Sequence, residues 1–185
     1  SKSFTKDFLK KYGIPTGDYR TFSEVESAYK YILSLNLPIV IKADGLAAGK
    51  GVIIAQSHKE AKAAVEDMLR GNLLSKAGSK VVIEEFLEGE EASFIIISDG
   101  KGFLPFATSQ DHKTAYDEDK GPNTGGMGAY SPAPVVTNQV FRRVVDQIIK
   151  PTLQGMADEG NPYTGFLYAG LMIDGEGNPK VIEFN

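Results

Sequence analysis

The sequence predicts an α+β protein built from two units. In residues 16–87, short runs rich in β-branched residues alternate with segments that carry helix-start signals. From residue 88 onward, pairs of such runs are joined by tight-turn sequences typical of hairpins. With 185 residues, of which 42% are hydrophobic, the chain is long enough to bury a substantial core, as one domain or as one domain with a small subdomain.

Composition excludes several classes of function. The net charge of −4 without a basic cluster gives no sign of nucleic-acid binding. No apolar run approaches the roughly 20 residues of a membrane span and no signal peptide opens the chain, so we expect a cytoplasmic protein without a membrane partner. The absence of cysteine removes disulfides and thiolate chemistry, and two distant histidines make no zinc site.

Helix signals mark four segments of the chain. The expected helices are residues 3–12, residues 23–36, residues 57 to about 70 with Gly71 as the stop, and a long helix capped by Thr137 and kinked by Pro151. Two of them begin with capping boxes, Ser23 with Glu26 and Ser57 with Glu60.

Strand signals fill most of the remaining chain. We expect two strands within residues 39–55, and extended segments at 16–22, 80–86, 92–98, 102–109, 165–173 and 179–185. Asp99-Gly100 is a strong hairpin signal. Residues 110–133 are polar and rich in glycine, and we expect a long loop there.

Residues 39–55 have the composition of a phosphate-binding turn between two strands. The turn contains Gly45, Gly49 and Gly51, with Lys50 between the last two. Glycines at this density let the backbone approach a ligand and direct its N–H groups at phosphate oxygens. Lys42, midway along the first strand, is unusual for a half-buried position but suits a phosphate neighbour. The alternative is a flexible hairpin with an ordinary surface lysine.

This turn differs from two better-known phosphate loops. A Walker A loop has Ser or Thr after its Gly-Lys pair and leads into a helix, whereas here Gly51 follows Lys50 and a strand comes next. In the kinase glycine-rich loop the lysine lies on the following strand, whereas Lys42 lies on the preceding one.

The last strand, KVIEFN, carries candidate metal ligands. Side chains alternate along a strand, so Glu183 and Asn185 point to the same face. A carboxylate beside an amide oxygen suits Mg²⁺, which takes few protein oxygens and completes its shell with phosphates and water. The alternative is a solvated hairpin edge.

The stretch from residue 81 to residue 94 connects the two units and could form a hinge that binds adenine. Backbone groups can mimic base pairing there, with the Glu85 carbonyl accepting and the Leu87 N–H donating, while Glu91 could accept from ribose hydroxyls. The candidate nucleotide contacts on this stretch are Glu84, Glu85, Phe86, Leu87 and Glu91. The alternative is a solvated acidic turn.

The expected loop at 110–133 is a candidate substrate-side segment. Its candidate residues are Asp111, His112, Lys113, Asn123, Thr124, Gly125 and Gly126, which combine acidic, titratable and cationic groups with exposed backbone donors. The alternative is a mobile surface loop.

Together these motifs resemble the ATP-grasp superfamily and, within it, the phosphoribosylamine–glycine ligase (glycinamide ribonucleotide synthetase) family. The matching segments are SKSFTKDFL, IVIKADGLAAGKGVI, EEFLEGEEASF, SQDHK with GPNTGGMGAYSP, and GFLYAGLMI followed by VIEFN. The resemblance runs from the first residues to the last. The SQDHK and GPNTGGMGAYSP pair is its most specific part, while a strand lysine and E-x-N alone indicate only the superfamily.

The resemblance implies an ATP-grasp fold, with two α+β subdomains and the nucleotide between them. Residues 1–15 would be an N-terminal linking helix, residues 16–87 the small lid subdomain, and residues 88–185 a large subdomain truncated at its C-terminal end. Lys2 and Lys42 look like the two lysines that hold the α- and β-phosphates, and Val40 looks like part of the adenine wall.

The metal site departs from the wider superfamily in one respect. Glu183 and Asn185 look like the Mg²⁺ ligands, with Mn²⁺ as an alternative ion. A second acidic ligand is usual on the preceding strand, where this chain has Leu171 at the position we assign to the acid.

The reaction implied by the resemblance is ATP-dependent joining of glycine to 5-phosphoribosylamine in purine biosynthesis, through glycyl phosphate. Further N- and C-terminal domains would be partners in the same enzyme, so we expect this piece to be inactive alone. Another ATP-grasp carboxylate–amine ligase or carboxylase is one alternative, and a nucleotide-binding module without turnover is another.

Overall fold

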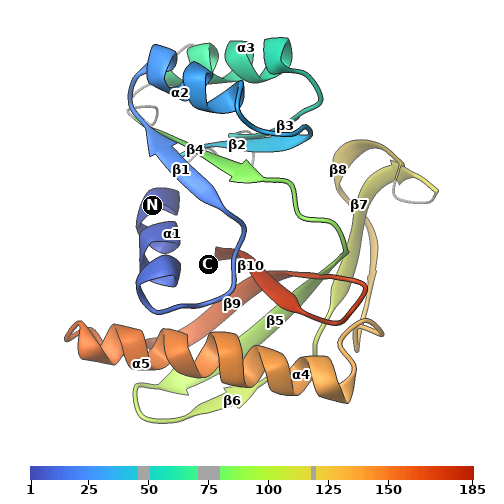
Figure 1. Ribbon diagram of the computed structural model, residues 1–185. Helices are drawn as coiled ribbons and strands as arrows, with labels where there is room; N and C mark the ends of the chain where they lie inside the picture. The colour runs from blue at the N-terminus through green and yellow to red at the C-terminus, as the bar shows by residue number, and fades with distance from the viewer. Residues whose placement is uncertain (46–50, 71–79, 118–119) are drawn as a thin grey trace. The chain divides into compact units, whose positions relative to one another are not determined.

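The computed structural model describes residues 1–45, 51–70, 80–117 and 120–185 (Figure 1). The chain divides into two compact units. The first consists of Ser1–Phe8 with Gly17–Leu87, and the second of Leu9–Thr16 with Glu88–Asn185. Residues of α1 therefore belong to both units. None of the helices within the described ranges is long and apolar enough to cross a membrane.

The helical elements are α1 (Lys2–Lys11), α2 (Val25–Ile32), α3 (His58–Leu69), α4 (Asn138–Val144), the π-helical turn η1 (Val145–Ile149) and α5 (Lys150–Asp158). The strands are β1 (Tyr19–Phe22), β2 (Ile39–Ala43), β3 (Val52–Ala55), β4 (Val81–Glu85), β5 (Glu90–Asp99), β6 (Phe103–Pro105), β7 (Gln110–Tyr116), β8 (Lys120–Tyr130), β9 (Thr164–Ile173) and β10 (Pro179–Phe184).

The first unit contains an antiparallel four-stranded sheet in the order β1-β4-β2-β3. Helices α2 and α3 cover one face of this sheet (Figure 1). The side chains directed at these helices form the core and include Ile39, Ile41, Ala43, Val81 and Ile83. Because side chains alternate along a strand, the opposite face carries the residues between them.

That opposite face, which we call the α1 face, carries the polar candidate residues. In the strand register Val40 lies beside Glu84, and Lys42 lies beside Val82. The ion pair between Lys6 and Glu84 ties α1 to this face. The same alternation that builds the core under α2 and α3 therefore directs Lys42 and Glu84 away from it.

The second unit contains a four-stranded sheet in the order β10-β9-β5-β6 and a separate two-stranded sheet, β7-β8. The helical layer from α4 to α5 runs along one face of the larger sheet (Figure 1). Phe94 of β5 and Phe141 of α4 pack with ring centroids 5.2 Å apart at this contact. The other face of the sheet, which we call the hairpin face, carries Glu91, Ser93 and Tyr168, as the strand register shows.

Of the two expected helix caps, the structure has one. The Ser57 cap is confirmed, because its hydroxyl accepts the Glu60 N–H at 3.1 Å. The Ser23 cap is wrong: α2 begins one residue later, with Glu24 in an extended conformation at the N-cap, and it ends at Ile32. The core contacts of Ala28 and Ile32 fix the position of this short helix, and the chain then turns before Pro38.

The long helix changes its winding at the expected proline. Pro151 is near the start of α5, directly after η1. Proline has no backbone N–H and its ring collides with the carbonyl four residues earlier, so the α-helical pattern cannot continue through it. A π-helical turn accommodates this defect without ending the helix.

The expected long loop at 110–133 is wrong, because most of it forms the β7-β8 hairpin. The strands pair antiparallel from Gln110 with Tyr130 to Tyr116 with Lys120, with two register shifts. The expectation relied on apolar alternation, which marks a strand with one buried face. This ribbon is joined by backbone hydrogen bonds and leaves much of β8 exposed, so its sequence carries no such pattern.

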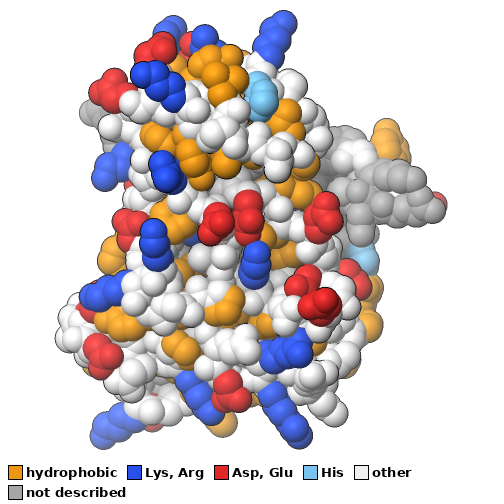
Figure 2. Space-filling model, viewed as in Figure 1, with side chains coloured by type: hydrophobic (Ala, Val, Ile, Leu, Met, Phe, Trp, Pro, Cys, Tyr) orange, Lys and Arg blue, Asp and Glu red, His pale blue; other side chains and the backbone are white. Residues whose placement is uncertain are grey.

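Charged side chains of both signs are interspersed over the visible surface of the molecule (Figure 2). This distribution agrees with the small net charge of −4.

Candidate functional site

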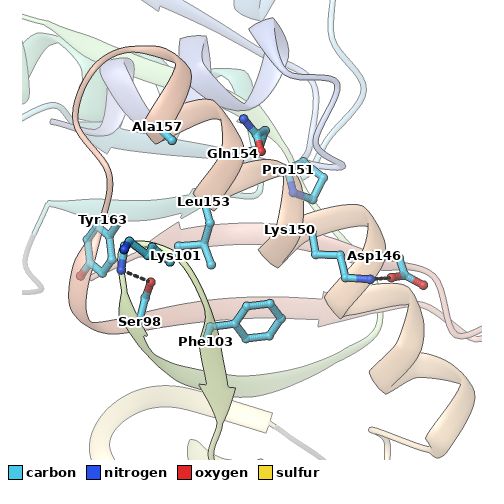
Figure 3. Close-up of a pocket in the computed structure, with 11 residues that line it drawn as sticks. Ser98, Lys101, Phe103, Asp146, Lys150, Pro151, Leu153, Gln154, Ala157 and Tyr163 are labelled. Carbon is cyan, nitrogen blue, oxygen red and sulfur yellow. Dashed lines mark hydrogen bonds and ion pairs between the residues drawn. The ribbon is translucent and has the colours of Figure 1, made fainter.

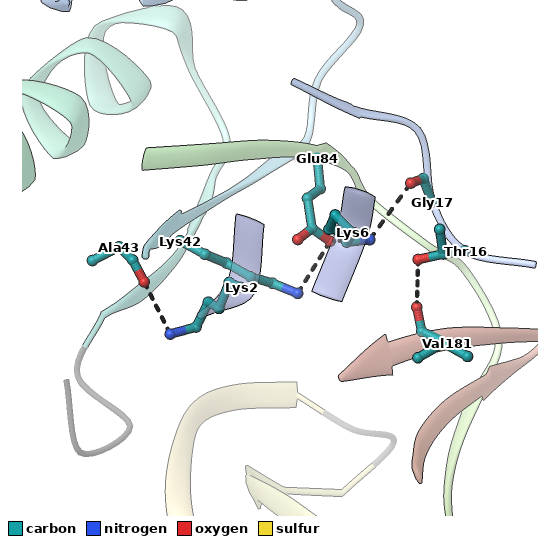
Figure 4. Close-up of polar contacts among 8 residues, drawn as sticks. All are labelled: Lys2, Lys6, Thr16, Gly17, Lys42, Ala43, Glu84 and Val181. Carbon is teal, nitrogen blue, oxygen red and sulfur yellow. Dashed lines mark hydrogen bonds and ion pairs between the residues drawn. The ribbon is translucent and has the colours of Figure 1, made fainter. Parts of the chain in front are cut away.

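Lys42 lies in a buried group of three charged side chains on the α1 face. Its Nζ is 3.1 Å from Glu84 Oε2, and Lys6 Nζ is 2.9 Å from the same oxygen (Figure 4). The side chains of Lys6, Lys42 and Glu84 are 3%, 8% and 6% exposed. Burial lowers the pKa of Lys6, against the attraction of Glu84. One carboxylate oxygen thus serves two lysines from elements far apart in sequence.

The start of α1 is fastened to the beginning of the glycine-rich turn. Lys2 Nζ donates to the carbonyl of Ala43 at 2.9 Å and to that of Gly45 at 3.3 Å. The Asp44 carboxylate accepts from the Ser3 N–H at 2.6 Å and from the Ser3 hydroxyl at 2.9 Å. Burial raises the pKa of Asp44, but these hydrogen bonds outweigh it and hold the pKa below its ordinary value.

Apolar side chains lie beside the lysines on the α1 face. Val40 is half-buried and neighbours both Glu84 and Ile54 in the sheet register. Ile54 is 40% exposed and Val52 is 43% exposed. Exposed apolar groups next to buried cations provide both kinds of contact that a nucleotide offers, a flat base and a charged phosphate chain.

At the expected hinge, β4 ends and the chain leaves the sheet. The Glu85 N–H donates to the Asp18 carbonyl at 2.9 Å. Phe86 is exposed, whereas Leu87 is half-buried and lies near Gly17. The backbone of Glu85 is therefore still bonded to its unit, and β4 ends at this residue.

Glu91 begins a second polar cluster, on the hairpin face of the other sheet. Lys113 of β7 donates to Glu91 Oε1 at 2.7 Å and lies 3.7 Å from Asp111 Oδ2. Burial lowers the pKa of Lys113, but the hydrogen bond and charge of Glu91 outweigh it and raise the pKa above its usual value. Ser93 donates to the Tyr168 hydroxyl oxygen at 3.2 Å, and burial raises the pKa of this tyrosine.

Glu183 and Asn185 share the hairpin face with this cluster. A bulge between Val181 and Glu183 shifts the register, so that Glu183 lies opposite Gly170. Asn185 exchanges two backbone hydrogen bonds with Tyr168, at 2.8 and 3.0 Å, which extends the ladder by one pair. Cross-strand partners lie on one face, so the carboxylate and the amide project to the same side as Tyr168.

The oxygen donors at the end of β10 fit a cation that takes most of its ligands from other sources. Among the described residues, no three His, Cys, Asp or Glu side chains group closely enough to hold a metal ion. Glu183 and Asn185 are exposed and provide two hard oxygen donors. That number suits Mg²⁺ shared with phosphates and water.

Known proteins match the whole chain. Residues 1–185 match the family described as the phosphoribosylglycinamide synthetase ATP-grasp (A) domain. The chain belongs to this family. It is 69% identical to phosphoribosylamine–glycine ligase of Pseudomonas syringae pathovar tomato, over all of this chain and 43% of that protein.

Solved structures agree with this family assignment. The crystal structure of phosphoribosylamine–glycine ligase from Thermotoga maritima superposes with a TM-score of 0.87 at 40% identity, over 100% of this chain and 46% of that one. The ATP complex of D-alanine–D-alanine ligase from Bacillus anthracis superposes with a TM-score of 0.71 at 20% identity, over 100% of this chain and 53% of that one, which shows a common fold. The ATP-grasp fold predicted from the sequence is confirmed. This ATP-grasp (A) domain spans less than half the length of the two phosphoribosylamine–glycine ligases.

One expected position in the ATP-grasp (A) domain is wrong. The sequence analysis placed the missing second acid at Leu171, but Leu171 pairs with Val181 and is fully buried on the helix-covered face. The residue opposite Glu183 is Gly170. Counting residues along the strand could not reveal this, because the bulge in β10 changes which residue of β9 faces the carboxylate.

In this ATP-grasp (A) domain, the candidate residues of the β7-β8 hairpin lie at separate places along the hairpin. The His112 ring packs on Tyr130 with centroids 5.0 Å apart, and the Thr124 hydroxyl accepts from the Gly126 N–H at 3.0 Å. Gly125 is exposed. Lys113 pairs with Glu91 and also lies near Asp111.

Some predicted residues lie outside the described part of the chain, and some residues at the site were not predicted. Gly49 and Lys50 lie outside the described residues, as does Gly71, and of Asn123 only the backbone pairing with Thr114 is described. Gly51 accepts the Ala43 N–H through its carbonyl at 2.8 Å. Lys6, Ser93 and Tyr168 were missed. For Lys6 a signal existed, since Lys2 and Lys6 are four residues apart and therefore share one helix face.

A cavity of about 490 Å³ in the second unit is separate from these clusters. It lies between α5 and the β5-β6 turn, and the Lys150–Asp146 ion pair, at 2.7 Å, lies at its edge (Figure 3). Among the residues that the structure describes, none of the predicted site residues lines it. We therefore locate the candidate site from the chemistry of the candidate residues and not from this cavity.

Proposed function

We propose that this chain is the nucleotide-binding part of a ligase that uses ATP to join glycine to 5-phosphoribosylamine, giving glycinamide ribonucleotide, ADP and phosphate. The observation that carries the proposal is the placement of Lys42 beside Glu84 on the α1 face, next to the glycine-rich turn where Lys2 is bound. The family assignment supplies the substrates, which are named from the relatives.

In this proposal the first unit binds the nucleotide. Lys2 and Lys42 hold the α- and β-phosphates, with backbone N–H groups of the glycine-rich turn beside them. Val40 contacts the adenine, and the exposed Ile54 beside it extends the apolar surface. The backbone of Glu84, Glu85 and Leu87 completes the base contacts.

In this proposal the second unit contributes the contacts to the ribose and to the metal ion. Glu91 accepts from the ribose hydroxyls. Glu183 and Asn185 would hold Mg²⁺, which neutralises phosphate charge when bound. The assignments of residues 16–87 as the lid subdomain and of the hairpin as the substrate-side segment belong to the same proposal.

The chemistry requires positioning and charge neutralisation rather than a nucleophile from the protein. A glycine carboxylate oxygen attacks the γ-phosphorus, and the bond to ADP breaks to give glycyl phosphate. The amine of phosphoribosylamine then attacks the acyl carbon, and phosphate leaves with the glycine oxygen. Lys42 and Lys2 stabilise the phosphate charge, which is the main contribution that an enzyme makes to phosphoryl transfer.

The experiment uses the full-length protein with ATP, phosphoribosylamine and glycine labelled with ¹⁸O in its carboxylate. We expect glycinamide ribonucleotide and transfer of one ¹⁸O to the released phosphate. Nucleotide binding without product from these substrates would favour a module without turnover. Product only with a different acid or amine would favour another ATP-grasp ligase. Either result contradicts the proposal.

A further inference from the structure

Glu84 is shared between two lysines through a single oxygen atom. Lys42 reaches Oε2 at 3.1 Å and Lys6 reaches the same atom at 2.9 Å (Figure 4). The other oxygen, Oε1, is buried and has no hydrogen-bond partner among the residues that the structure describes. The sequence analysis gave Lys6 no role, and the proposed reaction does not use it.

Lys6 is enclosed by groups of its own unit. Besides Glu84, its Nζ donates to the Gly17 carbonyl at 3.5 Å and lies 5.7 Å from the centre of the Tyr19 ring. Its residue is 2% exposed. These contacts hold the Nζ of Lys6 beside Glu84. It acts on the atom it touches, the Glu84 carboxylate.

The charges explain what this contact achieves. A carboxylate paired with a single lysine forms a closed pair, in which the cation is held by its partner and its charge is cancelled. A second lysine on the same oxygen shares the carboxylate, so Glu84 does not cancel the charge of Lys42 alone. Burying these groups costs free energy, so the arrangement is a weak source of fold stability. The lowered pKa of Lys6 agrees with that cost.

We infer that Lys6 is a positioning residue for nucleotide binding: it holds and neutralises Glu84, so that Lys42 keeps its charge for the phosphates. This inference rests on the proposed function. It predicts that loss of Lys6 weakens the phosphate contribution to binding, and that removal of the Glu84 charge restores it.

The test measures dissociation constants of ADP and of adenosine, with Mg²⁺, for the full-length protein. The ratio of the adenosine constant to the ADP constant reports the phosphate contribution. We expect Lys6→Met to lower this ratio about tenfold, the size of one charge-assisted contact. The double variant Lys6→Met/Glu84→Gln should return to within about threefold of the original ratio, because no carboxylate then competes for Lys42.

Lys10→Met is the matched control, since Lys10 is an exposed lysine on the same helix. It should leave the ratio unchanged. An unchanged ratio in Lys6→Met would overturn the inference, and so would a low ratio that persists in the double variant, which would mean that Lys6 binds phosphate directly. If Lys6→Met does not fold, Glu84→Gln is compared with the double variant. Equal ratios support the inference, and a tenfold lower ratio in the double variant contradicts it. Failure of the unsubstituted protein to bind ADP would instead contradict the proposed function.

Discussion

Gly170 on β9 lies directly opposite Glu183 on β10, and a Cβ atom at Gly170 would lie 3.3 Å from Glu183 Cγ. The same Cβ would lie 3.3 Å from the Tyr168 ring. The absence of a side chain at Gly170 therefore makes room for both the proposed metal ligand and the tyrosine beside it.

Gly170→Ala should displace Glu183 or Tyr168 by a few tenths of an ångström. We expect turnover of the full-length protein to fall about 3- to 10-fold, since small displacements of reacting groups are costly. The free energy of unfolding should fall by about 1 kcal/mol because of overpacking. Turnover against Mg²⁺ concentration and denaturant unfolding measure the two effects. Gly175→Ala is the control, because a Cβ there meets nothing within 4 Å. Equal behaviour of the two variants would contradict the prediction.

Glu183→Gln keeps the shape of the side chain and removes its charge. We expect turnover to fall about 100-fold, the size of losing one electrostatic contact to a developing charge. The free energy of unfolding should change by less than about 0.5 kcal/mol, because the side chain is exposed. Turnover at several Mg²⁺ concentrations and a denaturant melt test this. Unaltered turnover with an unaltered Mg²⁺ requirement would exclude Glu183 as a ligand.

Lys42→Ala should weaken ADP binding by about 1.5–3 kcal/mol, roughly one to two decades in affinity. The reason is loss of a charge-assisted contact from a lysine fixed on a strand by Glu84. Calorimetric titration with ADP and Mg²⁺ measures it. Lys30→Ala, an exposed lysine of α2, serves as the control and should bind normally. Similar losses in both variants would show that Lys42 has no particular role.

Shortening the hairpin between Tyr116 and Thr124 should leave ADP affinity within about threefold and abolish product formation. The contact of Lys113 with Glu91 lies outside the shortened part, so the proposed ribose contact keeps its partner. ADP titration is paired with the product assay. Retained product formation would mean that this part of the hairpin does not serve the acceptor substrate.

Asp44 should make stability depend on pH in the acid range. Its pKa in the folded state is lowered, so its contribution is fully present above the unfolded value, about 4, and is lost as the pH falls through the folded value. Asp44→Asn should therefore reduce the free energy of unfolding at pH 6 and differ less from the original protein near pH 3. Urea melts between pH 6 and pH 3 provide the comparison. A difference independent of pH would contradict the assigned contacts with Ser3.

The site was only partly predictable from the sequence, because part of it depends on contacts between segments that are distant in the chain. The position of Lys42 on a strand before the glycine-rich turn followed from the local sequence, and so did the shared face of Glu183 and Asn185. Both depend on the period-two alternation of a strand, which is a local property. The β7-β8 hairpin was not predicted, because backbone pairing without a buried apolar face leaves no pattern in the side chains.

The sequence by itself determined the α+β class, most of the helices and strands, the Ser57 cap and the β9-β10 hairpin, since each depends on residues close together in the chain. Only the tertiary structure decided that Lys6 and Lys42 meet at Glu84, that Lys113 pairs with Glu91, and that Gly170 rather than Leu171 faces Glu183. These contacts depend on sheet register, on a bulge and on the docking of a helix. Such relationships join residues that are distant in the chain, and no local pattern encodes them.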